Sequence, residues 1–160
     1  MEAAILRLLR ENARISFEEI AERLDTTVDE IASAVARLEH EKIIQGYHTI
    51  VDEAQLNKNI VKAIIQVSTR PEREGGFDKI ARRLSRFSEV SSLYLVSGGF
   101  DLQIVVEGET LNEVASFVSS KLATVDGVIS TETHFLLKKY KESGKVLYDD
   151  DEYERLKITP

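Results

Sequence analysis

The chain has 160 residues, of which 42% are hydrophobic, so it can form one packed domain or two small ones. It contains no cysteine, which excludes a disulfide framework, a thiolate metal site and a cysteine nucleophile. Nucleic-acid binding favours a basic surface, so the formal net charge of -7 argues against a nucleic-acid partner. It does so only weakly, because a small basic patch is compatible with an acidic total.

Three helices are predicted near the N-terminus. Apolar residues recur at helical spacing within residues 2–12. Ser16 and Glu19 form a capping box, a pattern in which two side chains satisfy the unpaired backbone N–H groups at a helix start. Thr27 and Glu30 form a second box and begin a third helix. The apolar residues of this third helix fall at i, i+4 and i+7: Ile31, Val35 and Leu38.

Only a short turn separates the second and third predicted helices. Two helices joined in this way, behind a first helix that can cover their apolar sides, predict a helix-turn-helix unit for DNA binding. A small three-helix cap that binds no ligand fits the same pattern. Periodicity and spacing by themselves leave both interpretations open.

A polar stretch marks the boundary between two domains. Residues 53–60 follow the third helix and a short extended segment, and their polar side chains indicate a linker. We therefore predict a helix-turn-helix domain in residues 1–50, a linker in 51–60, a second domain in 61–140 and a C-terminal tail in 141–160.

The second domain is organised around a hairpin pattern in residues 90–108. Apolar and polar residues alternate on both sides of Gly98 and Gly99, and glycine supplies the positive φ that tight hairpin turns require. A helical pattern and then a further strand pattern flank this hairpin on each side. The resulting order, βαββαβ, predicts an α+β fold of the ferredoxin-like type.

Both helices predicted in this domain are amphipathic. Phe77, Ile80, Ala81 and Leu84 repeat at helical spacing in the first, with Asp78, Lys79, Arg82, Arg83 and Arg86 on its other faces. Thr110 and Glu113 form a capping box that begins the second. Two helices can cover one face of a four-stranded sheet, and the other face would stay exposed in a monomer. Because an apolar patch of that size marks an interface, we expect a homodimer. The candidates for the open face are Ile65, Tyr94, Val105 and Phe135.

Five segments together carry a family resemblance. They are the run of residues 5–16, the helix pair, Leu38-Glu39 followed by Ile43-Ile44, the turn of residues 96–101 and the closing strand of residues 131–133. In this order the chain resembles the Lrp/AsnC family, the leucine-responsive and asparagine-responsive transcription regulators, across almost its whole length. The resemblance implies a winged-helix-like helix-turn-helix domain joined to a ferredoxin-like effector domain. It also implies dimers that assemble into octamers and bind amino acids where subunits meet.

The turn from Ser97 to Asp101 is the predicted effector site. Backbone N–H groups of the glycines can approach a carboxylate closely, and Asp101 can pair with an ammonium. The resemblance implies that residues of the last strand lie nearby. The alternative is that the glycines only make the hairpin and that Asp101 caps it. The candidate effector-binding residues are Ser97, Gly98, Gly99, Phe100, Asp101, Thr131 and Thr133.

The predicted recognition helix departs from its family. Related proteins carry Ser or Thr and then one or two Arg, whereas the matching residues here are Glu30, Ser33 and Ala34. Residues 1–50 contain six Lys and Arg against ten Asp and Glu, a balance of -4. Acidic residues at a helix start favour the helix dipole but repel phosphates. The candidate DNA contacts are Arg14, Thr26, Thr27, Ser33 and Arg37.

Enzymatic and membrane functions find no support in the sequence. His40, His48 and His134 lie in different predicted elements, so we expect no metal site and no cofactor. No phosphate-binding loop of the form Gly-x4-Gly-Lys-Ser/Thr occurs. Neither a long apolar run nor a signal-peptide pattern is present, so we expect a cytoplasmic protein with no membrane partner and no enzymatic activity.

The sequence thus predicts a sequence-specific, DNA-binding transcription regulator that responds to a small metabolite, by resemblance an amino acid bound at subunit interfaces. Its expected partners are double-stranded DNA, the effector and further copies of itself. The alternative is an effector-sensing homologue with weak or lost DNA binding that acts through a partner subunit, because the recognition helix is acidic.

Overall fold

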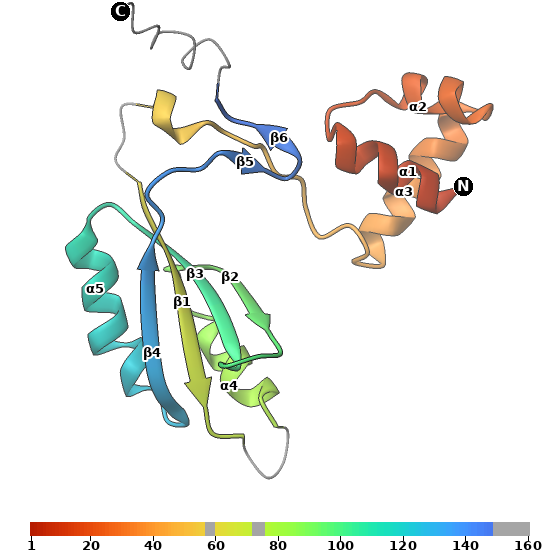
Figure 1. Ribbon diagram of the computed structural model, residues 1–160. Coiled ribbons are helices and arrows are strands. Elements are labelled where there is room, and N and C mark those ends of the chain that lie inside the picture. The colour runs from red at the N-terminus through yellow and green to blue at the C-terminus, as the bar shows by residue number, and fades with distance from the viewer. Residues whose placement is uncertain (57–59, 72–75, 149–160) are drawn as a thin grey trace, which may run out of the picture. The chain divides into compact units, whose positions relative to one another are not determined.

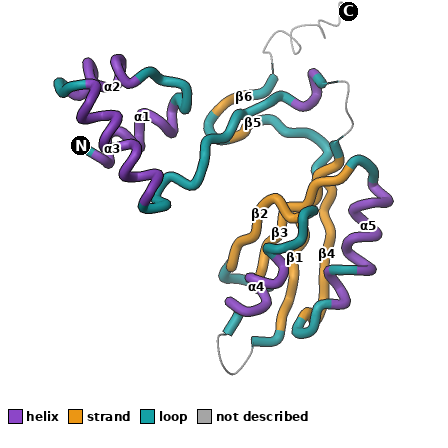
Figure 2. Tube along the Cα trace, turned by 180° about the vertical axis from the view of Figure 1, so that it is seen from behind, coloured by secondary structure: helices purple, strands orange, loops and turns teal. Residues whose placement is uncertain are grey.

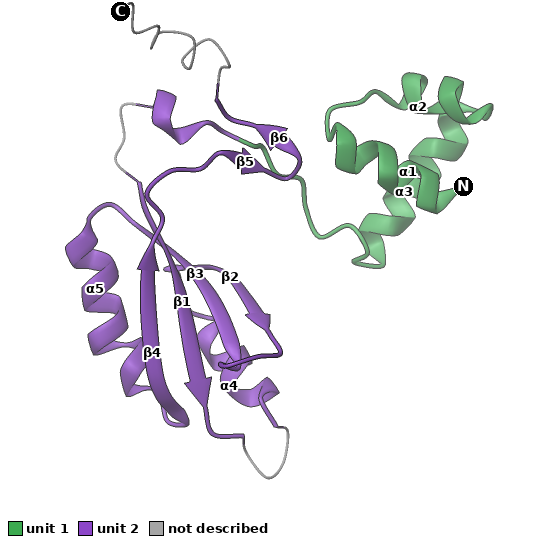
Figure 3. Ribbon diagram, in the orientation of Figure 1, with its two compact units in different colours: residues 1–50 green, residues 51–160 purple. Residues whose placement is uncertain are grey.

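The structure is a computed structural model that describes residues 1–56, 60–71 and 76–148. The chain divides into two compact units, unit 1 of residues 1–50 and unit 2 of residues 51–160 (Figure 3). Parts of the predicted linker and of the predicted C-terminal tail, residues 57–59 and 149–160, lie outside the described residues. Among the described residues, no helix is both long enough and apolar enough to cross a membrane.

Unit 1 consists of the helices α1 (Glu2–Glu11), α2 (Phe17–Leu24) and α3 (Val28–His40) (Figure 1). Helix α2 begins where the Ser16 hydroxyl accepts a hydrogen bond from the N–H of Glu19 at 3.1 Å. Helix α3 begins with a complete capping box between Thr27 and Glu30. The predicted helix-turn-helix is therefore confirmed, and both of its helices start at the predicted caps.

The three helices of unit 1 enclose a small apolar core. Ile5 of α1, Ile20 of α2 and Ile31 of α3 are each 0% exposed, so every helix contributes a fully buried side chain. Ala34 is also buried, at 3% exposure. One of the residues that match the family's DNA-contacting positions is thus part of the core and points away from solvent.

Unit 2 contains a four-stranded sheet whose strands lie in the order β2-β3-β1-β4, with every neighbouring pair antiparallel. Its elements are β1 (Val61–Thr69), α4 (Asp78–Leu84), β2 (Val90–Leu95), β3 (Leu102–Gly108), α5 (Leu111–Ser120) and β4 (Val128–Phe135). Helices α4 and α5 cover one face of the sheet (Figures 1 and 2). The predicted βαββαβ order and the α+β fold are confirmed.

Short elements complete unit 2. A 3-10 helix, η1 (Glu53–Gln55), precedes the sheet, and another, η2 (Leu122–Thr124), follows α5. After β4, the strands β5 (Lys141–Glu142) and β6 (Lys145–Val146) pair as a small hairpin. Residues 45–52, which connect α3 to η1, form neither helix nor strand.

The helix-covered face of the sheet is the core face. Ile80 and Leu84 of α4 are both 0% exposed and pack on it. Phe117 of α5 meets Phe87 edge to face, with ring centroids 5.5 Å apart, which is a favoured geometry for aromatic pairs. Gly127 lies so close to this core that a Cβ at its position would come within 2.6 Å of Ile80 Cδ1.

The prediction for the open face of the sheet is partly wrong. Ile65 is 0% exposed and pairs with Ile104, so it faces the helices, and Ile64 takes its place on the open face opposite Val105. Phe135 pairs with Ala63 and also belongs to the helix side by register. Tyr94 does lie on the open face, with 53% of its surface exposed. Ile64 and Ile65 are both apolar, so alternation alone cannot decide which of the two faces the helices.

Candidate functional site

Four of the five predicted DNA contacts lie close to or on α3. Ser33 and Arg37 are exposed on the helix and line a shallow hollow of about 340 Å3. Thr26 and Thr27 precede the helix at the turn that follows α2. Arg14 is separate from these residues, in the loop between α1 and α2, where its backbone N–H donates to Asn12 Oδ1 at 3.0 Å.

The two threonines of this group are engaged by Glu30. Its Oε2 atom accepts hydrogen bonds from the Thr26 hydroxyl, from the Thr27 N–H at 3.1 Å and from the Thr27 hydroxyl at 3.1 Å. These bonds lower the pKa of Glu30, with Thr26 contributing most, so the carboxylate is charged at neutral pH. A helix N-terminus attracts anions, and here the carboxylate of Glu30 already occupies that place.

Arg37 has an acidic partner as well. Its Nη2 atom forms an ion pair with Glu2 Oε1 of α1. The two side chains are 54% and 44% exposed, and exposed pairs of this kind add little stability. The pair therefore reduces the charge that Arg37 presents without fixing the side chain in place. As a result, three members of the DNA-contact group, Thr26, Thr27 and Arg37, already have carboxylate partners, which leaves the Ser33 hydroxyl and the separate Arg14 guanidinium for a phosphate.

The predicted effector turn closes the hairpin between β2 and β3. The Val96 N–H donates to the Asp101 carbonyl at 2.9 Å, so residues 97–100 form the loop. Gly98 has a φ of 150°, which disfavours any residue with a side chain, whereas Gly99 has no such requirement. A Cβ at either glycine would meet nothing within 4 Å, so the backbone of the turn is open to solvent.

Asp101 ties this turn to the end of β1. Its Oδ2 atom accepts hydrogen bonds from the Thr69 N–H at 2.7 Å and from the Thr69 hydroxyl at 3.4 Å. The Asp101 N–H donates to the Val67 carbonyl at 3.1 Å. Among the described residues, the second carboxylate oxygen, Oδ1, has no hydrogen-bond partner. The capping role that the sequence left open is thus present, and it leaves one oxygen available.

Thr131 and Thr133 do not join this turn within one chain. They lie on β4, opposite Val67 and Ile65 of β1, and β3 lies on the other side of β1. Because neighbouring strands are about 4.8 Å apart, β4 and β3 are separated by roughly 10 Å. The register also directs both threonines to the helix-covered face. The structure therefore brings together the residues from Ser97 to Asp101 but not the two threonines.

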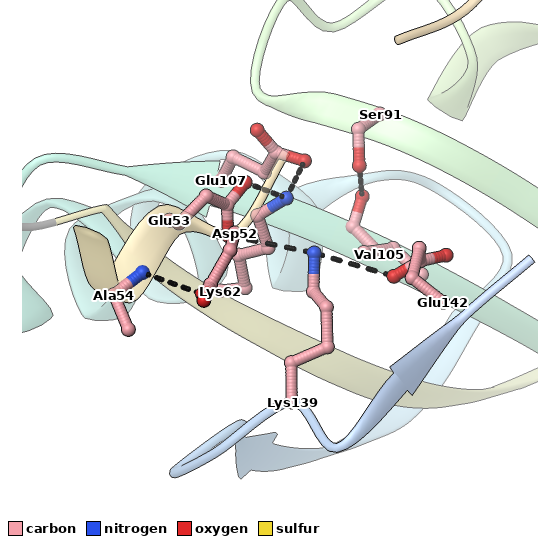
Figure 4. A network of polar contacts seen from close by, with 9 residues as sticks. All are labelled: Asp52, Glu53, Ala54, Lys62, Ser91, Val105, Glu107, Lys139 and Glu142. Atoms are coloured by element: carbon pink, nitrogen blue, oxygen red, sulfur yellow. Dashed lines mark hydrogen bonds and ion pairs between the residues drawn. The ribbon is translucent and has the colours of Figure 1, made fainter. Parts of the chain in front are cut away.

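The sequence interpretation missed a second polar cluster, which we call the linker clasp. It consists of Glu53, Lys62, Glu107, Lys139 and Glu142. Lys62 Nζ contacts Glu53 at 2.7 Å and Glu107 at 3.0 Å, and Lys139 Nζ contacts Glu53 at 3.5 Å and Glu142 at 3.2 Å (Figure 4). The clasp joins η1 to strands β1 and β3 and to the β5–β6 hairpin.

The centre of the clasp is partly buried, and each of its two lysines contacts two carboxylates. The Lys62 side chain is 17% exposed and that of Glu53 is 26% exposed. Burial alone raises the pKa of Glu53, but the hydrogen bonds and charges of Lys62 and Lys139 lower it overall. Burial alone lowers the pKa of Lys62, but its bonds to Glu53 and Glu107 raise it overall. A hollow of about 430 Å3 adjoins the clasp, and the clasp residues that line it, Glu53, Lys62 and Lys139, are already paired with one another. The cross-strand pair of Lys62 and Glu107 is visible only once the register of β1 and β3 is known.

No group of three or more His, Asp or Glu side chains able to hold a metal ion occurs in the described parts of the chain.

Residues 3–39 match the AsnC-type helix-turn-helix domain, and residues 62–146 match the Lrp/AsnC ligand-binding domain. The chain belongs to the Lrp/AsnC family of transcription regulators. The two matched domains coincide with the helix-turn-helix of unit 1 and with the sheet of unit 2.

Sequence matches between this Lrp/AsnC regulator and its relatives cover most of the chain. It is 43% identical over 160 residues to an uncharacterised HTH-type transcriptional regulator of Bacillus subtilis, YugG, and the match covers 99% of this chain and 96% of the relative. It is 32% identical over 137 residues to the HTH-type transcriptional regulator LrpA of Pyrococcus horikoshii, covering 86% of this chain and 94% of the relative. The family consists of transcription regulators and not of enzymes, as predicted.

Solved structures share the fold. Escherichia coli AsnC superposes with a TM-score of 0.66 at 23% identity, covering 88% of this chain and 93% of AsnC. The regulator NMB0573 of Neisseria meningitidis, solved as a complex with L-Met, superposes with a TM-score of 0.68 at 25% identity, covering 88% of this chain and 90% of that one. The Lrp/AsnC chain thus combines a DNA-binding helix-turn-helix with a ligand-binding domain, as the sequence predicted.

Proposed function

We propose that this Lrp/AsnC regulator binds operator DNA through α3 and responds to an amino acid held at the turn of residues 97–101. The observation that carries the proposal is the presence in one chain of the AsnC-type helix-turn-helix and the Lrp/AsnC ligand-binding domain. An amino acid is the effector class that the L-Met complex of the Neisseria relative supports. The protein works in the cytoplasm, where its DNA lies.

The turn offers complementary groups to the two ends of an amino acid. Open backbone at Gly98 and Gly99 can donate N–H groups to the effector carboxylate. Asp101 Oδ1 can accept from the ammonium, while the bonds from Thr69 to Oδ2 hold the carboxylate in place beforehand. A side chain that is already fixed loses little conformational freedom on binding, which favours affinity.

The separation of the turn from β4 favours an effector site shared between subunits. Within one chain β1 lies between the turn and Thr131, so a single amino acid cannot bridge the two directly. If Thr131 and Thr133 contribute, they do so from a neighbouring copy. The exposed apolar face of the sheet around Ile64, Tyr94 and Val105 is the proposed dimer surface, and the octamer is what the family resemblance implies.

A titration of the full-length protein against its own promoter region tests this proposal. Binding is measured at low and high salt, with and without each amino acid. We expect specific binding that weakens with salt and shifts with one amino acid. Asp101→Asn should abolish the amino-acid shift and leave DNA binding in its absence unchanged, because Asn lacks the charge that pairs with an ammonium. Glu109→Gln, which removes a different exposed carboxylate of unit 2, serves as the control. A shift that persists in Asp101→Asn would place the effector elsewhere.

A second function is favoured by the contacts of α3. Glu30 holds both threonine donors, Glu2 pairs with Arg37, and unit 1 is acidic overall. These observations support an effector-sensing homologue with weak DNA affinity that acts through a more basic partner subunit. Binding no stronger than to a random fragment, even at low salt, would support this alternative and contradict direct operator binding.

A further inference from the structure

Helix α4 carries a row of cations on its outer side. Lys79, Arg82 and Arg83 lie on α4 at i, i+3 and i+4, a spacing that places them along one face of the helix, and Arg86 follows in the turn beyond the last helical residue, Leu84. All four are exposed. The opposite side of the helix is buried through Ile80 and Leu84. We call Arg82, Arg83 and Arg86 the arginine stripe.

The arginine stripe is uncompensated. Across the described ranges 1–56, 60–71 and 76–148, none of its three guanidinium groups forms an ion pair or a hydrogen bond. Some other basic side chains do have carboxylate partners, among them Arg23 with Glu19, Arg37 with Glu2 and Lys121 with Glu89. Lys79 does have an interaction partner, so it is not included in the arginine stripe. A region of dense positive charge thus faces solvent on a protein whose net charge is -7.

A hollow adjoins the stripe on the side of the edge strand β2. It measures about 330 Å3 and is lined by Arg82, by three serines and by three apolar residues: Ser85, Ser91, Ser92, Ala81, Val90 and Leu93. Because β2 is the last strand of the sheet, this side of the hollow is open to a ligand. The Ser85 hydroxyl donates to the Arg82 carbonyl at 3.1 Å and the Ser91 hydroxyl to the Val105 carbonyl at 3.2 Å. The guanidinium of Arg82 is therefore the main group that the hollow offers to a phosphate of a nucleic-acid backbone.

The size of the stripe matches the spacing of DNA phosphates. From Lys79 to the last residue of α4, Leu84, the helix rises roughly 7.5 Å at about 1.5 Å per residue, and Arg86 lies in the turn beyond. One strand of B-DNA carries a phosphate about every 3.4 Å along the axis, so the helical part of this length faces roughly two phosphates. Cations that neutralise phosphates supply most of the sequence-independent affinity for DNA. The recognition helix α3 offers for this purpose only Arg37, which is shared with Glu2.

On these grounds, and resting on the proposed function, we propose that the arginine stripe and the hollow beside it are a second DNA-contact surface, which binds the phosphate backbone. The stripe consists of three like charges, whereas charged residues are depleted at the centre of a protein–protein interface. Ala81, Val90 and Leu93 are confined to the hollow. Backbone contacts hold DNA without reading its sequence, so discrimination between sequences stays with α3. Separate copies in an assembly can present the two surfaces to one DNA, and the avidity of several copies increases the effect.

The test compares full-length variants in DNA-binding titrations over about 50 to 300 mM salt, with the operator and with a random duplex. Arg82→Gln with Arg83→Gln removes two charges and leaves Ile80 and Leu84 in place. Arg82→Lys with Arg83→Lys keeps the charges. Lys141→Gln with Lys145→Gln removes two charges from the exposed β5–β6 hairpin and is the matched control.

We expect the double glutamine variant of α4 to bind both duplexes about tenfold more weakly at low salt, with an unchanged ratio between them. The slope of log affinity against log salt should become shallower by about 0.9 for each phosphate that the variant no longer neutralises. The lysine variant and the hairpin control should behave like the wild type. Equal thermal unfolding of all variants verifies that folding is intact.

Three outcomes contradict the proposal in different ways. If the wild type binds the operator and the α4 glutamine variant keeps its slope and affinity, the second surface does not exist, and the proposed function stands. If that variant instead changes only the sedimentation of the protein, the stripe contacts another protein, such as the acidic unit 1 of a second copy. If the wild type binds no DNA at all, the proposed function fails and this inference fails with it.

Discussion

Helices α3 and α4 have opposite surfaces. The exposed side of α3 begins with Asp29 and Glu30, and its threonine and arginine groups already have carboxylate partners. The exposed side of α4 and the turn after it carry three arginines for which no partner occurs in the described part of the chain. The helix-turn-helix motif identifies α3 as the helix that would read DNA, whereas the unpaired positive charge lies on a different element, at α4.

The two helices are nevertheless alike on their inner sides. Ile31 of α3 and Ile80 of α4 are both 0% exposed, and each packs into the core of its own unit. The contrast therefore lies in the outer residues alone, where a substitution changes binding without changing the core. This separation makes the difference between the helices open to experiment.

The largest expected effect tests the independence of the two cores. Ile31→Ala and Ile80→Ala should each destabilise their own unit by about 3 kcal/mol, because each leaves a cavity in a closed core. Hydrogen exchange, read segment by segment, should show faster exchange in residues 1–50 for the first variant and in unit 2 for the second. Faster exchange throughout both units in either variant would show that the units fold as one and that their cores are not independent.

A smaller effect is expected at the linker clasp. Glu53→Gln removes the carboxylate that joins Lys62 and Lys139 and should destabilise unit 2 by about 1 to 2 kcal/mol in urea unfolding at neutral pH. Glu109→Gln, which removes an exposed carboxylate of the same unit, is the control and should cost much less. Equal destabilisation in the two variants would mean that the clasp stabilises nothing.

The pH dependence of this destabilisation follows from the two pKa shifts. The pKa of Glu53 is lowered, so its contribution is present above the unfolded value of 4.5 and is lost as pH falls through the folded value. The pKa of Lys62 is raised, so its contribution is present below 10.5 and is lost as pH rises through the folded value. The difference between wild type and Glu53→Gln should stay level between about pH 5 and pH 10 and shrink on either side.

Glu30→Gln tests whether the acidic start of α3 limits DNA binding. Glutamine can still take part in a capping box, so the helix start should persist while the negative charge disappears. We expect an increase in DNA affinity of roughly threefold to tenfold at low salt, because one repulsion of phosphate is removed. Glu41→Gln, at the other end of α3, removes the same charge and should have a smaller effect. An equal gain in DNA affinity from both variants would show that the net charge of the protein, and not the position of Glu30, limits binding.

The smallest effect should follow from releasing Arg37. Glu2→Gln removes its partner, and we expect an increase in DNA affinity of about twofold, because an exposed ion pair holds its members weakly. Glu11→Gln, at the other end of α1, is the matched control. If Arg37→Gln leaves DNA binding unchanged, Arg37 makes no contact with DNA, and Glu2 has nothing to release.

Local signals in the sequence predicted the helices well. The threonine and serine caps at Ser16, Thr27 and Thr110 each accept the expected N–H. The reciprocal bond of the capping box forms only at Glu30. Glu19 pairs with Arg23 at 2.6 Å, and Glu113 accepts from the Glu109 N–H at 2.7 Å. A cap depends on adjacent residues, but a long side chain selects among several partners that only the folded chain brings near.

Contacts between residues far apart in the chain could not be predicted from the sequence. The partner of Asp101 is Thr69, which lies 32 residues earlier in the chain. The face assigned to Ile65 was wrong because the neighbouring Ile64 is equally apolar, and only pairing with β3 decides between them. The arginines of α4 were visible in the sequence, but their lack of partners was not.

The two glycines of the effector turn will tolerate change differently over evolutionary time. Gly98 has a backbone angle that a side chain would strain, so a substitution there alters the loop itself. Gly99 has neither a positive φ nor a neighbour within 4 Å of an added Cβ. A lineage that replaces Gly99 keeps the loop and brings new atoms toward whatever the turn holds. Selection can therefore alter ligand preference at one codon while the adjacent codon preserves the shape of the turn.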